Sequence, residues 1–296
     1  MKNLSIFIDS TGDLDTELRK KYDIDYCEMG LTFKGKEIIA SLDWDQGYDP
    51  HSFYDVMRSG EKIFTSQVTR GEFEKKFSAA LEKGNDILYI ACSSALSKSV
   101  DMGRTIADEL KKKYKDSKIA VIDSLICGYA QGDMAIRSRE MYKEGKSLEE
   151  IAAWLEENKL RYNQWAAVDN LNYLKRAGRV KASSAFFGNL FGVKPIVISD
   201  VNGINYAVEK VKGRKQSLIK IVEEAIRTAD DIENQTIYIA HSDDLEGAEF
   251  CKTELLKRVK PKAIHLGILG PIIGGSTGPG TIAVYSFGEK VTAVGK

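Results

Sequence analysis

The sequence is poor in the residues on which catalytic sites usually depend. Histidine occurs only at His51, His241 and His265, so few side chains can act as a general base. The dinucleotide, P-loop and His-Glu-x-x-His motifs are also absent, so nothing indicates nucleotide or zinc chemistry. His241 follows a predicted strand and is the best candidate for a general base, although such a histidine more often packs or caps a helix. We therefore predict a protein without catalytic residues.

The four cysteines are too dispersed to form a site. Cys27, Cys92, Cys127 and Cys251 include no Cys-x-x-Cys pair, whereas metal sites and disulfide frameworks need close, patterned spacing. We interpret all four as reduced thiols, and we predict neither a metal ion nor a cofactor.

The chain also lacks any excess of charge and any long apolar run. Lys+Arg and Asp+Glu number 43 each, whereas nucleic-acid binding usually shows a basic excess. No run approaches the roughly 20 apolar residues that span a bilayer, and the first apolar run is too short for a signal peptide. These absences predict a cytoplasmic protein with no nucleic-acid partner and no stable membrane insertion.

What the sequence does contain is a strand–helix alternation in its first half. Short apolar runs predict strands at Leu4–Asp9, Ile87–Cys92 and Ile119–Asp123. Amphipathic segments predict helices over 71–83, 103–114 and 147–158, with another helix after Asp123. Such alternation indicates a Rossmann-like parallel sheet covered on both faces. Residues 24–45 interrupt it and predict a small β insertion.

The second half predicts a mixed α/β domain. Pro195–Ser199 and Ile204–Val211 flank Asn202-Gly203, which favours a hairpin turn. The other predicted strands and helices are strands at 165–168, 236–240, 263–268 and 281–287 and helices at 170–177, 215–229 and 244–258. We place the domain boundary near residue 160, which gives domains 1–160 and 161–296.

Three clusters of small hydroxyl side chains follow predicted strands or lie in turns. They are Asp9–Asp13, Thr65–Thr69 and Cys92–Ser97. Singly, Ser10, Thr69 and Ser94 are more typical of helix caps. Together they favour a shared anion site, since ligands of open α/β sheets bind beyond the carboxyl ends of the strands.

The run Gly270–Gly280 contains five glycines and two prolines in eleven residues. That density predicts a loop that needs positive φ or that approaches a ligand closely. It lacks the P-loop pattern, so a nucleotide is not indicated.

The ordered motifs resemble the DegV family along the whole chain. The matching segments are Phe7–Leu14, Thr65–Gln67, Ser93–Ser97, Val121–Ser124, Asn172–Arg179, Lys194–Pro195, Lys210–Arg214 and Gly278–Gly280. The resemblance implies two α/β domains with a tunnel between them that holds a long-chain fatty acid. It also implies a non-catalytic protein that presents the acid to a fatty-acid kinase.

The resemblance implies roles for particular residues. Thr65, Ser93 and Ser94 match the positions that bind the carboxylate, and Ser276 and Thr277 lie in the loop near the head group. Two arginines match the family's arginine-bearing turns and are predicted to contact the partner, namely Arg179 and Arg214.

Four residues depart from the family pattern, namely Val68, Lys98, Ala177 and Ser276. Ser276 stands where the family usually has histidine, which puts the presentation to a kinase in doubt more than the binding of lipid. Two other functions stay open: a serine-dependent hydrolase acting on a lipid ester, and a carrier of another amphiphile such as an isoprenoid or branched acid.

Overall fold

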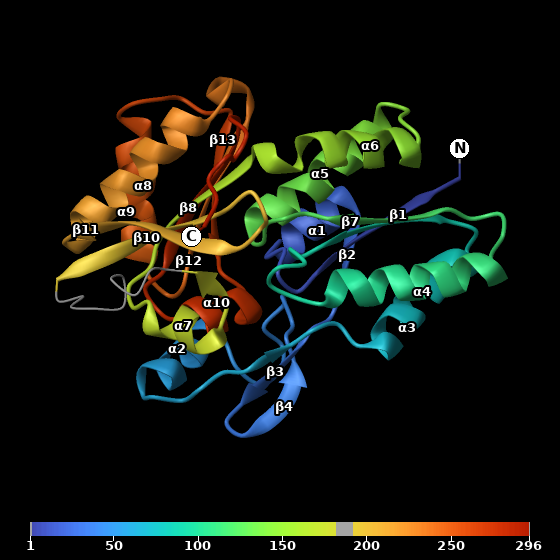
Figure 1. The fold of residues 1–296 in the computed structure, drawn as a ribbon, viewed down its shortest axis with the longest axis horizontal. Coiled ribbons are helices and arrows are strands. Elements are labelled where there is room, and N and C mark those ends of the chain that lie inside the picture. The colour runs from blue at the N-terminus through green and yellow to red at the C-terminus, as the bar shows by residue number, and fades with distance from the viewer. Residues whose placement is uncertain (1, 182–191, 296) are drawn as a thin grey trace.

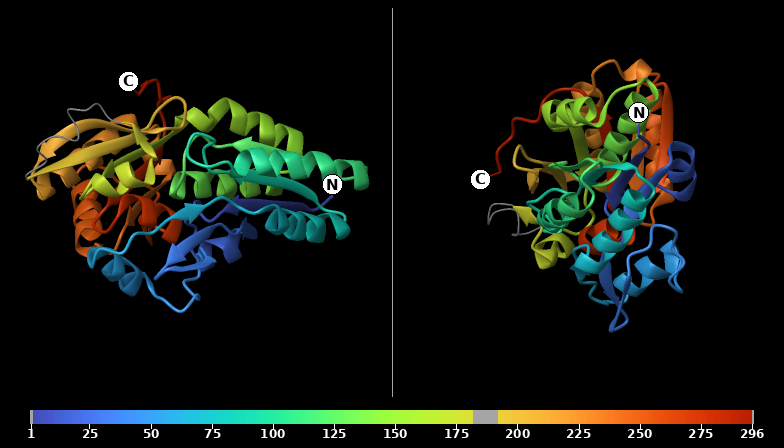
Figure 2. Two further views of the ribbon diagram at one scale, coloured as in Figure 1. Left: turned by 60° about the horizontal axis from the view of Figure 1, so that its bottom comes forward. Right: turned by 90° about the vertical axis from the view of Figure 1, so that its right-hand side faces the viewer.

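The computed structural model describes residues 2–181 and 192–295, and two α/β parts lie side by side in it (Figure 1). One part contains a sheet of four parallel strands, and the other contains a mixed sheet of seven strands. The turned views in Figure 2 show the same two parts. The predicted fold class, a Rossmann-like parallel sheet followed by a mixed α/β domain, is confirmed.

The parallel sheet has the strand order β2-β1-β6-β7. Its strands are β1 (Leu4–Asp9), β2 (Ile24–Cys27), β6 (Asp86–Ala91) and β7 (Ile119–Asp123). β1 and β6 are short runs whose side chains are buried on both faces of the sheet, as parallel strands between helices usually are. The prediction found three of these strands but assigned β2 to the insertion. β2 instead pairs in parallel with β1 along the sheet edge.

Helices cover both faces of this sheet. On one face, α5 (Tyr129–Lys143) and α6 (Leu148–Asn158) share an apolar core with Ile6, Leu88 and Ile122. On the other face, α3 (Arg70–Glu82) and α4 (Ser99–Lys113) share a second core with Phe7, Tyr89 and Ile119. Residues next to each other along a strand therefore serve different cores. The short helix α1 (Thr16–Tyr22) joins β1 to β2.

The β insertion is a separate antiparallel sheet of order β4-β3-β5. It consists of β3 (Gly30–Phe33), β4 (Lys36–Ile39) and β5 (Thr65–Ser66), with α2 (Pro50–Arg58) between the last two strands. Gly35 has a φ of 72° in the turn between β3 and β4, a conformation that favours glycine. The insertion thus begins at Gly30 rather than at residue 24. The four residues of β2 do not show in the sequence that this strand pairs in parallel with β1.

The mixed sheet has the strand order β13-β12-β14-β8-β10-β11-β9. Its strands are β8 (Tyr162–Ala167), β9 (Val180–Lys181), β10 (Val193–Ser199), β11 (Asn205–Lys212), β12 (Thr236–His241), β13 (Ala263–Ile268) and β14 (Ile282–Phe287). The predicted hairpin is confirmed, since β10 and β11 pair antiparallel and Gly203 in their turn has a φ of 74°.

The two faces of the mixed sheet meet different neighbours. Helices α8 (Arg214–Thr228) and α9 (Leu245–Leu256) pack on the outer face, where Ile282 and Val284 join their core. Alternate residues of the same strand, Ala283 and Tyr285, belong instead to the core that includes α5. The inner face therefore turns toward the parallel-sheet part.

The glycine-rich segment contains a helix, α10 (Pro271–Thr277), where the prediction had a loop. Pro271 stands in the first turn, where backbone N–H groups have no partner within the helix, so its missing N–H costs no hydrogen bond. A Cβ on Gly274 would lie 1.9 Å from the Tyr54 hydroxyl oxygen, so this helical glycine serves close packing. Positive φ occurs only beyond the helix, at Gly278 and Gly280.

The chain passes from the first sheet to the second between α6 and β8, through the 3-10 turn η1 (Lys159–Arg161). The predicted boundary near residue 160 falls at this passage, and the division into two domains there stays a prediction. The remaining short helices are α7 (Asn172–Ala177) and η3 (Ile232–Asn234). Within residues 2–181 and 192–295, no helix is both long and apolar enough to cross a bilayer.

Candidate functional site

A cavity of about 400 Å³ lies where the two parts meet. Loops that follow β1, β6 and β7 form one wall, and the inner face of the mixed sheet forms the opposite wall, which we call the floor. The rest of the cavity lining comes from the segment around β5 and from the helices α7 and α10. The volume lies within the range of small-molecule sites, and the carboxyl edge of a parallel sheet is where ligands of such folds bind.

Residues of all three predicted hydroxyl clusters line the cavity. Thr11 and Ser94 belong to the first wall, and Thr65 lies on β5. The clusters around Thr65 and Ser94 are tied together, because the Val68 N–H donates to the Ser99 hydroxyl at 3.1 Å. The expected cap is found at Thr69, which accepts from the Glu72 N–H at the start of α3.

Asp9, at the end of β1, fixes the positions of the loops in this wall. It is fully buried and accepts hydrogen bonds from the Tyr89 hydroxyl, the Cys92 N–H and the Gln131 amide at 2.9, 2.9 and 3.2 Å. These donors come from β6, the residue after it, and α5. The carboxylate thus holds two segments from elsewhere in the chain at the edge of the sheet.

Ser93 and Ser94 have different surroundings although they are adjacent. Ser94 lines the cavity, and its backbone N–H donates to Asp123 at 3.0 Å. Ser93 is fully buried and does not line the cavity, and its hydroxyl donates to the Gly203 carbonyl at 2.8 Å. The Ser93 hydroxyl therefore joins the loop after β6 to the β10–β11 turn, so the structure does not bring it together with the other predicted ligand-binding hydroxyls.

Ser276 and Thr277 line the cavity from α10. Two buried contacts fix the start of this helix: Asp13 accepts from the Gly270 N–H at 3.0 Å, and the Tyr54 hydroxyl donates to the Leu269 carbonyl at 2.6 Å. Burial raises the pKa of the Asp13 carboxyl well above its usual range. The last turn of α10 is thereby placed opposite the hydroxyls of the first wall.

The inner face of the mixed sheet forms the floor of the cavity. Alternate side chains of two strands line the floor. They are Gln164, Ala166 and Val168 along β8 and the residue after it, and Thr281, Ala283 and Tyr285 along β14 and the residue before it. Ala166 lies opposite Ala283 in the strand register. Because these two side chains are small, the sheet leaves room for a ligand at its centre.

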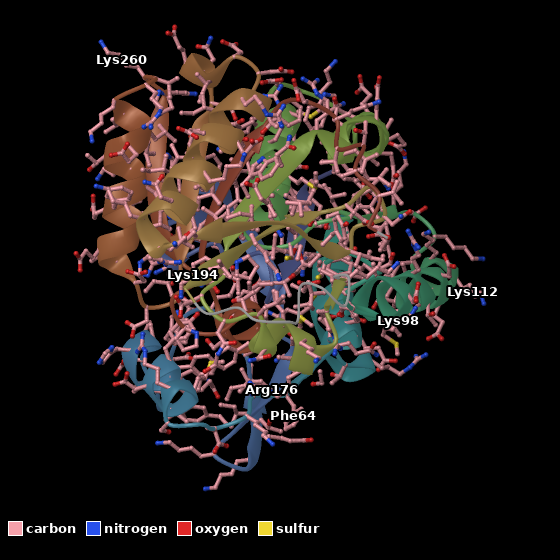
Figure 3. The ribbon with its side chains drawn as sticks, turned by 60° about the vertical axis from the view of Figure 1, so that its left-hand side comes forward. Phe64, Lys98, Lys112, Arg176, Lys194 and Lys260 are labelled. Atoms are coloured by element: carbon pink, nitrogen blue, oxygen red, sulfur yellow. The ribbon has the colours of Figure 1, made fainter. Side chains whose placement is uncertain are left out.

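Two cations line the cavity, Lys98 and Arg179. The Arg179 side chain is exposed, and its Nε donates to the Leu96 carbonyl at 3.3 Å. Figure 3 labels Lys98 and two other exposed side chains, Arg176 of α7 and Phe64 beside β5. Arg179, predicted to contact a partner, is therefore also within reach of a ligand.

Arg214, the second arginine predicted to contact a partner, does not line the cavity. Its guanidinium donates to the Asp244 carboxylate and to the Gly280 carbonyl, both at 2.6 Å. These bonds hold the residues after α10 against the start of α9, which leaves less of the side chain available to a partner than the sequence suggested.

None of the three histidines lines the cavity. His241 accepts from the Asp244 N–H at the start of α9, which is the predicted capping role, and burial lowers its pKa. His265 lies 3.0 Å from Asp15. No histidine is therefore placed to activate Ser94.

His51 is close to the carboxylates of Asp55 and Asp243, a set with metal-like spacing on the surface. Arg58 donates to both of these carboxylates, at 2.7 and 2.6 Å. Its guanidinium already supplies the positive charge there, so the group is an ion-pair cluster that links α2 to the residues after β12.

Sequence reasoning missed the floor of the cavity. Gln164, Asn205 and Tyr285 line it and are buried, but they belong to three strands and form no local motif. The available signal was the presence of polar and small residues at alternate positions, Gln164 and Ala166 in one strand and Thr281, Ala283 and Tyr285 in the other. Strands of a fully buried sheet do not usually place amides on an inner face.

Comparison with known proteins gives one consistent picture. The family model described as "Uncharacterised protein, DegV family" matches residues 3–289. A DegV domain-containing protein of Clostridium perfringens is 35% identical over 289 residues, which cover 98% of this chain and 99% of that protein.

Solved structures agree along the whole chain. A DegV lipid-binding protein from Thermotoga maritima has a TM-score of 0.86 at 24% identity, covering 99% of this chain and all of that one. A DegV family protein from Thermus thermophilus, described by its fatty-acid binding, has a TM-score of 0.86 at 25% identity, covering 97% of this chain and all of that one.

Proposed function

The chain belongs to the DegV family, and from that premise we propose that it binds one long-chain fatty acid in the cavity between its parallel sheet and its mixed sheet. The observation that carries the proposal is the composition of this cavity. One wall bears hydroxyl groups, and the floor bears Ala166, Val168, Val197 and Ala283. A molecule with one polar end and one long apolar end is complementary to such a site.

The energetics favour an acyl chain. Burying a sixteen-carbon chain contributes on the order of 10 kcal/mol at about 0.8 kcal/mol per methylene, and association opposes part of this. A buried carboxylate would offset much of the rest if it lacked hydrogen-bond donors. Donors are therefore essential at the polar end.

We propose that the carboxylate lies between Thr65, Ser94, Ser276 and Thr277, whose side chains line the cavity from β5, the loop after β6 and α10. Ser93 then contributes by holding the loop that carries Ser94. Arg179 and Lys98 line the same cavity, so the head-group site is not wholly neutral even though Ser276 replaces the histidine usual in the family. Positive charge there favours the ionised form of the acid.

We also propose that the protein is a cytoplasmic carrier that presents its acid to a fatty-acid kinase. Arg179 is exposed beside the cavity, and the four cysteines are free thiols, which suits a reducing compartment. A hydrolase function has no comparable support, because a serine nucleophile needs an adjacent base.

The test is the lipid content of the purified protein. Protein produced in a bacterial host should release about one long-chain fatty acid per chain on extraction, measured by mass spectrometry. An isotopically labelled hexadecanoic acid added before gel filtration should replace it and stay with the protein. Folded protein that carries no acid and retains none of the label would refute the proposal.

A further inference from the structure

The floor of the cavity contains a polar cluster that lies several strand residues from the α10 end of β14. It consists of Cys127, Gln164, Asn205 and Tyr285, which come from four different segments and all line the cavity. Gln164 and Asn205 are each 7% exposed and Tyr285 is 2% exposed. A site for a plain hydrocarbon chain has no need of such groups, since burying them without partners opposes folding.

The cluster is only partly satisfied by its own members. The Gln164 amide donates to the Asn205 side-chain oxygen at 3.0 Å, and the Cys127 thiol lies 3.9 Å from the Gln164 oxygen. Within the part of the chain that the structure describes, the Tyr285 hydroxyl and the Asn205 amide nitrogen make no hydrogen bond. Turning both amides over keeps one hydrogen bond between them and only exchanges which amide nitrogen is left over.

The surroundings of Tyr285 fix its hydroxyl in place. A Cβ on Gly128 would lie 2.3 Å from the Tyr285 hydroxyl oxygen, so the ring end reaches the backbone beside Cys127. In the sheet, Tyr285 lies directly opposite Gln164. The unsatisfied hydroxyl and the amide pair therefore face one region of the cavity.

The position of the cluster along the floor can be measured in strand residues. Thr281, whose hydroxyl donates to the Thr277 carbonyl, lies at the α10 end of β14, and Tyr285 is four residues further along. At about 3.3 Å per strand residue this separation is about 13 Å. An extended acyl chain needs about ten carbons to cover it, since each C–C bond of about 1.5 Å advances it by roughly 1.3 Å.

We infer that the ligand of this protein is a fatty acid with an oxygen substituent near the middle of its chain, a hydroxy or oxo acid, bound at the Tyr285–Gln164–Asn205 cluster. The inference rests on the proposed function and names its substrate class. A hydroxyl suits the site because it accepts from Tyr285 or Asn205 and donates to an amide oxygen. An unsubstituted chain leaves these groups unpaired.

The experiment is a competition between acids that differ only in this oxygen. Wild-type protein is incubated with an equimolar mixture of octadecanoic, 3-hydroxyoctadecanoic and 10-hydroxyoctadecanoic acids, and the bound acids are extracted and quantified by mass spectrometry. We expect the 10-hydroxy acid to be enriched about tenfold over octadecanoic acid, the value of one good net hydrogen bond. The 3-hydroxy acid should show no such enrichment.

The variant Tyr285→Phe removes only the hydroxyl, and it should lower severalfold the ratio of bound 10-hydroxy acid to bound octadecanoic acid. The matched control is Tyr142→Phe, whose hydroxyl donates to the Lys2 carbonyl outside the cavity. Equal binding of all three acids by the wild type overturns this inference and leaves the proposed function intact. Binding of none of them overturns the proposed function itself. The wild-type comparison decides the matter even where Tyr285→Phe fails to fold.

Discussion

The two walls of the cavity are built in different ways. The wall formed by the parallel-sheet part consists of loops, and buried carboxylates such as Asp9 and Asp123 hold their backbone N–H groups in place. The floor formed by the mixed sheet consists of alternate side chains on strands, whose positions follow from strand pairing alone. Loops can turn several donors toward one point, whereas a sheet face offers length and area. The first wall therefore suits a head group and the second suits a chain.

The largest effect should come from closing the floor. Replacing Ala283, which is 2% exposed and lines the cavity, by Phe places a ring in the path of the acyl chain. We expect the fatty acid recovered per chain to fall more than tenfold, because overpacked interiors rearrange only at a cost.

The matched control is Ala153→Phe, which puts the same ring on the exposed side of α6. Mass spectrometry of extracted lipid and a melting curve are recorded for both variants. Full lipid content in folded Ala283→Phe would mean that the chain does not lie on the sheet.

A smaller effect should come from the hydroxyl groups proposed to bind the carboxylate. Thr65→Val and Ser94→Ala each remove one hydroxyl that lines the cavity. Each should weaken binding of a long-chain acid about tenfold, since a hydrogen bond to a charged group contributes about 1.5–3 kcal/mol. Binding of the corresponding alcohol should change less. Isothermal titration with both ligands measures the difference.

The adjacent residue gives the contrast to Ser94. Ser93→Ala removes the hydroxyl that donates to the Gly203 carbonyl and leaves that carbonyl without this bond. We expect a loss of stability of about 1–3 kcal/mol, with affinity nearly unchanged in the folded protein. A Ser93→Ala variant that keeps its stability and loses affinity would put the carboxylate at Ser93 instead.

Arg179 tests whether charge contributes to the loop wall. Arg179→Gln should weaken binding of the acid only a few-fold, because an exposed ion pair contributes at most about 1 kcal/mol. The difference from wild type should shrink as salt is added. Arg176→Gln, which removes an equal charge from α7 outside the cavity, is the control and should leave affinity unchanged.

The smallest effect concerns Asp13, which joins the two walls at Gly270. Burial raises its folded-state pKa, so the unionised form is favoured and stability falls as pH rises from the unfolded value toward the folded one. Asp13→Asn keeps an acceptor oxygen and cannot ionise. The variant should match wild type near pH 3.5 and melt a few degrees higher at neutral pH. Equal melting temperatures of wild type and variant at both pH values would argue against ionisation of Asp13 at its contact with Gly270.

The sequence predicts the wall of loops better than it predicts the sheet floor. Strands such as Leu4–Asp9 and the clusters around Thr65 and Ser94 are visible because their chemistry is contiguous. The floor is not visible, because Gln164 and Tyr285 become neighbours only through the pairing of β8 with β14. Motif reasoning therefore finds the loop wall and misses the sheet.

Local composition also misled in two instructive places. The segment Pro271–Thr277 contains two glycines inside its helix, which lower helix propensity by about 1 kcal/mol each. Close packing against Tyr54 overrides that preference. Ser93 and Ser94 look equivalent in sequence, yet one hydroxyl donates to Gly203 and the other side chain lines the cavity. Both outcomes depend on residues far away in the chain.

The contacts that fix α10 have a consequence for biosynthesis. The Tyr54–Leu269 bond spans 215 positions and the Asp13–Gly270 bond spans 257. Contacts of such sequence separation form late, because the intervening chain must first lose its freedom. On the ribosome, the parallel sheet can assemble while later residues are still being added. The contacts of α2 and of the loop after β1 with residues 269–277 can form only once those residues have been synthesised. Under the proposed function, binding of the acid therefore follows translation past α10, when the chain is nearly complete.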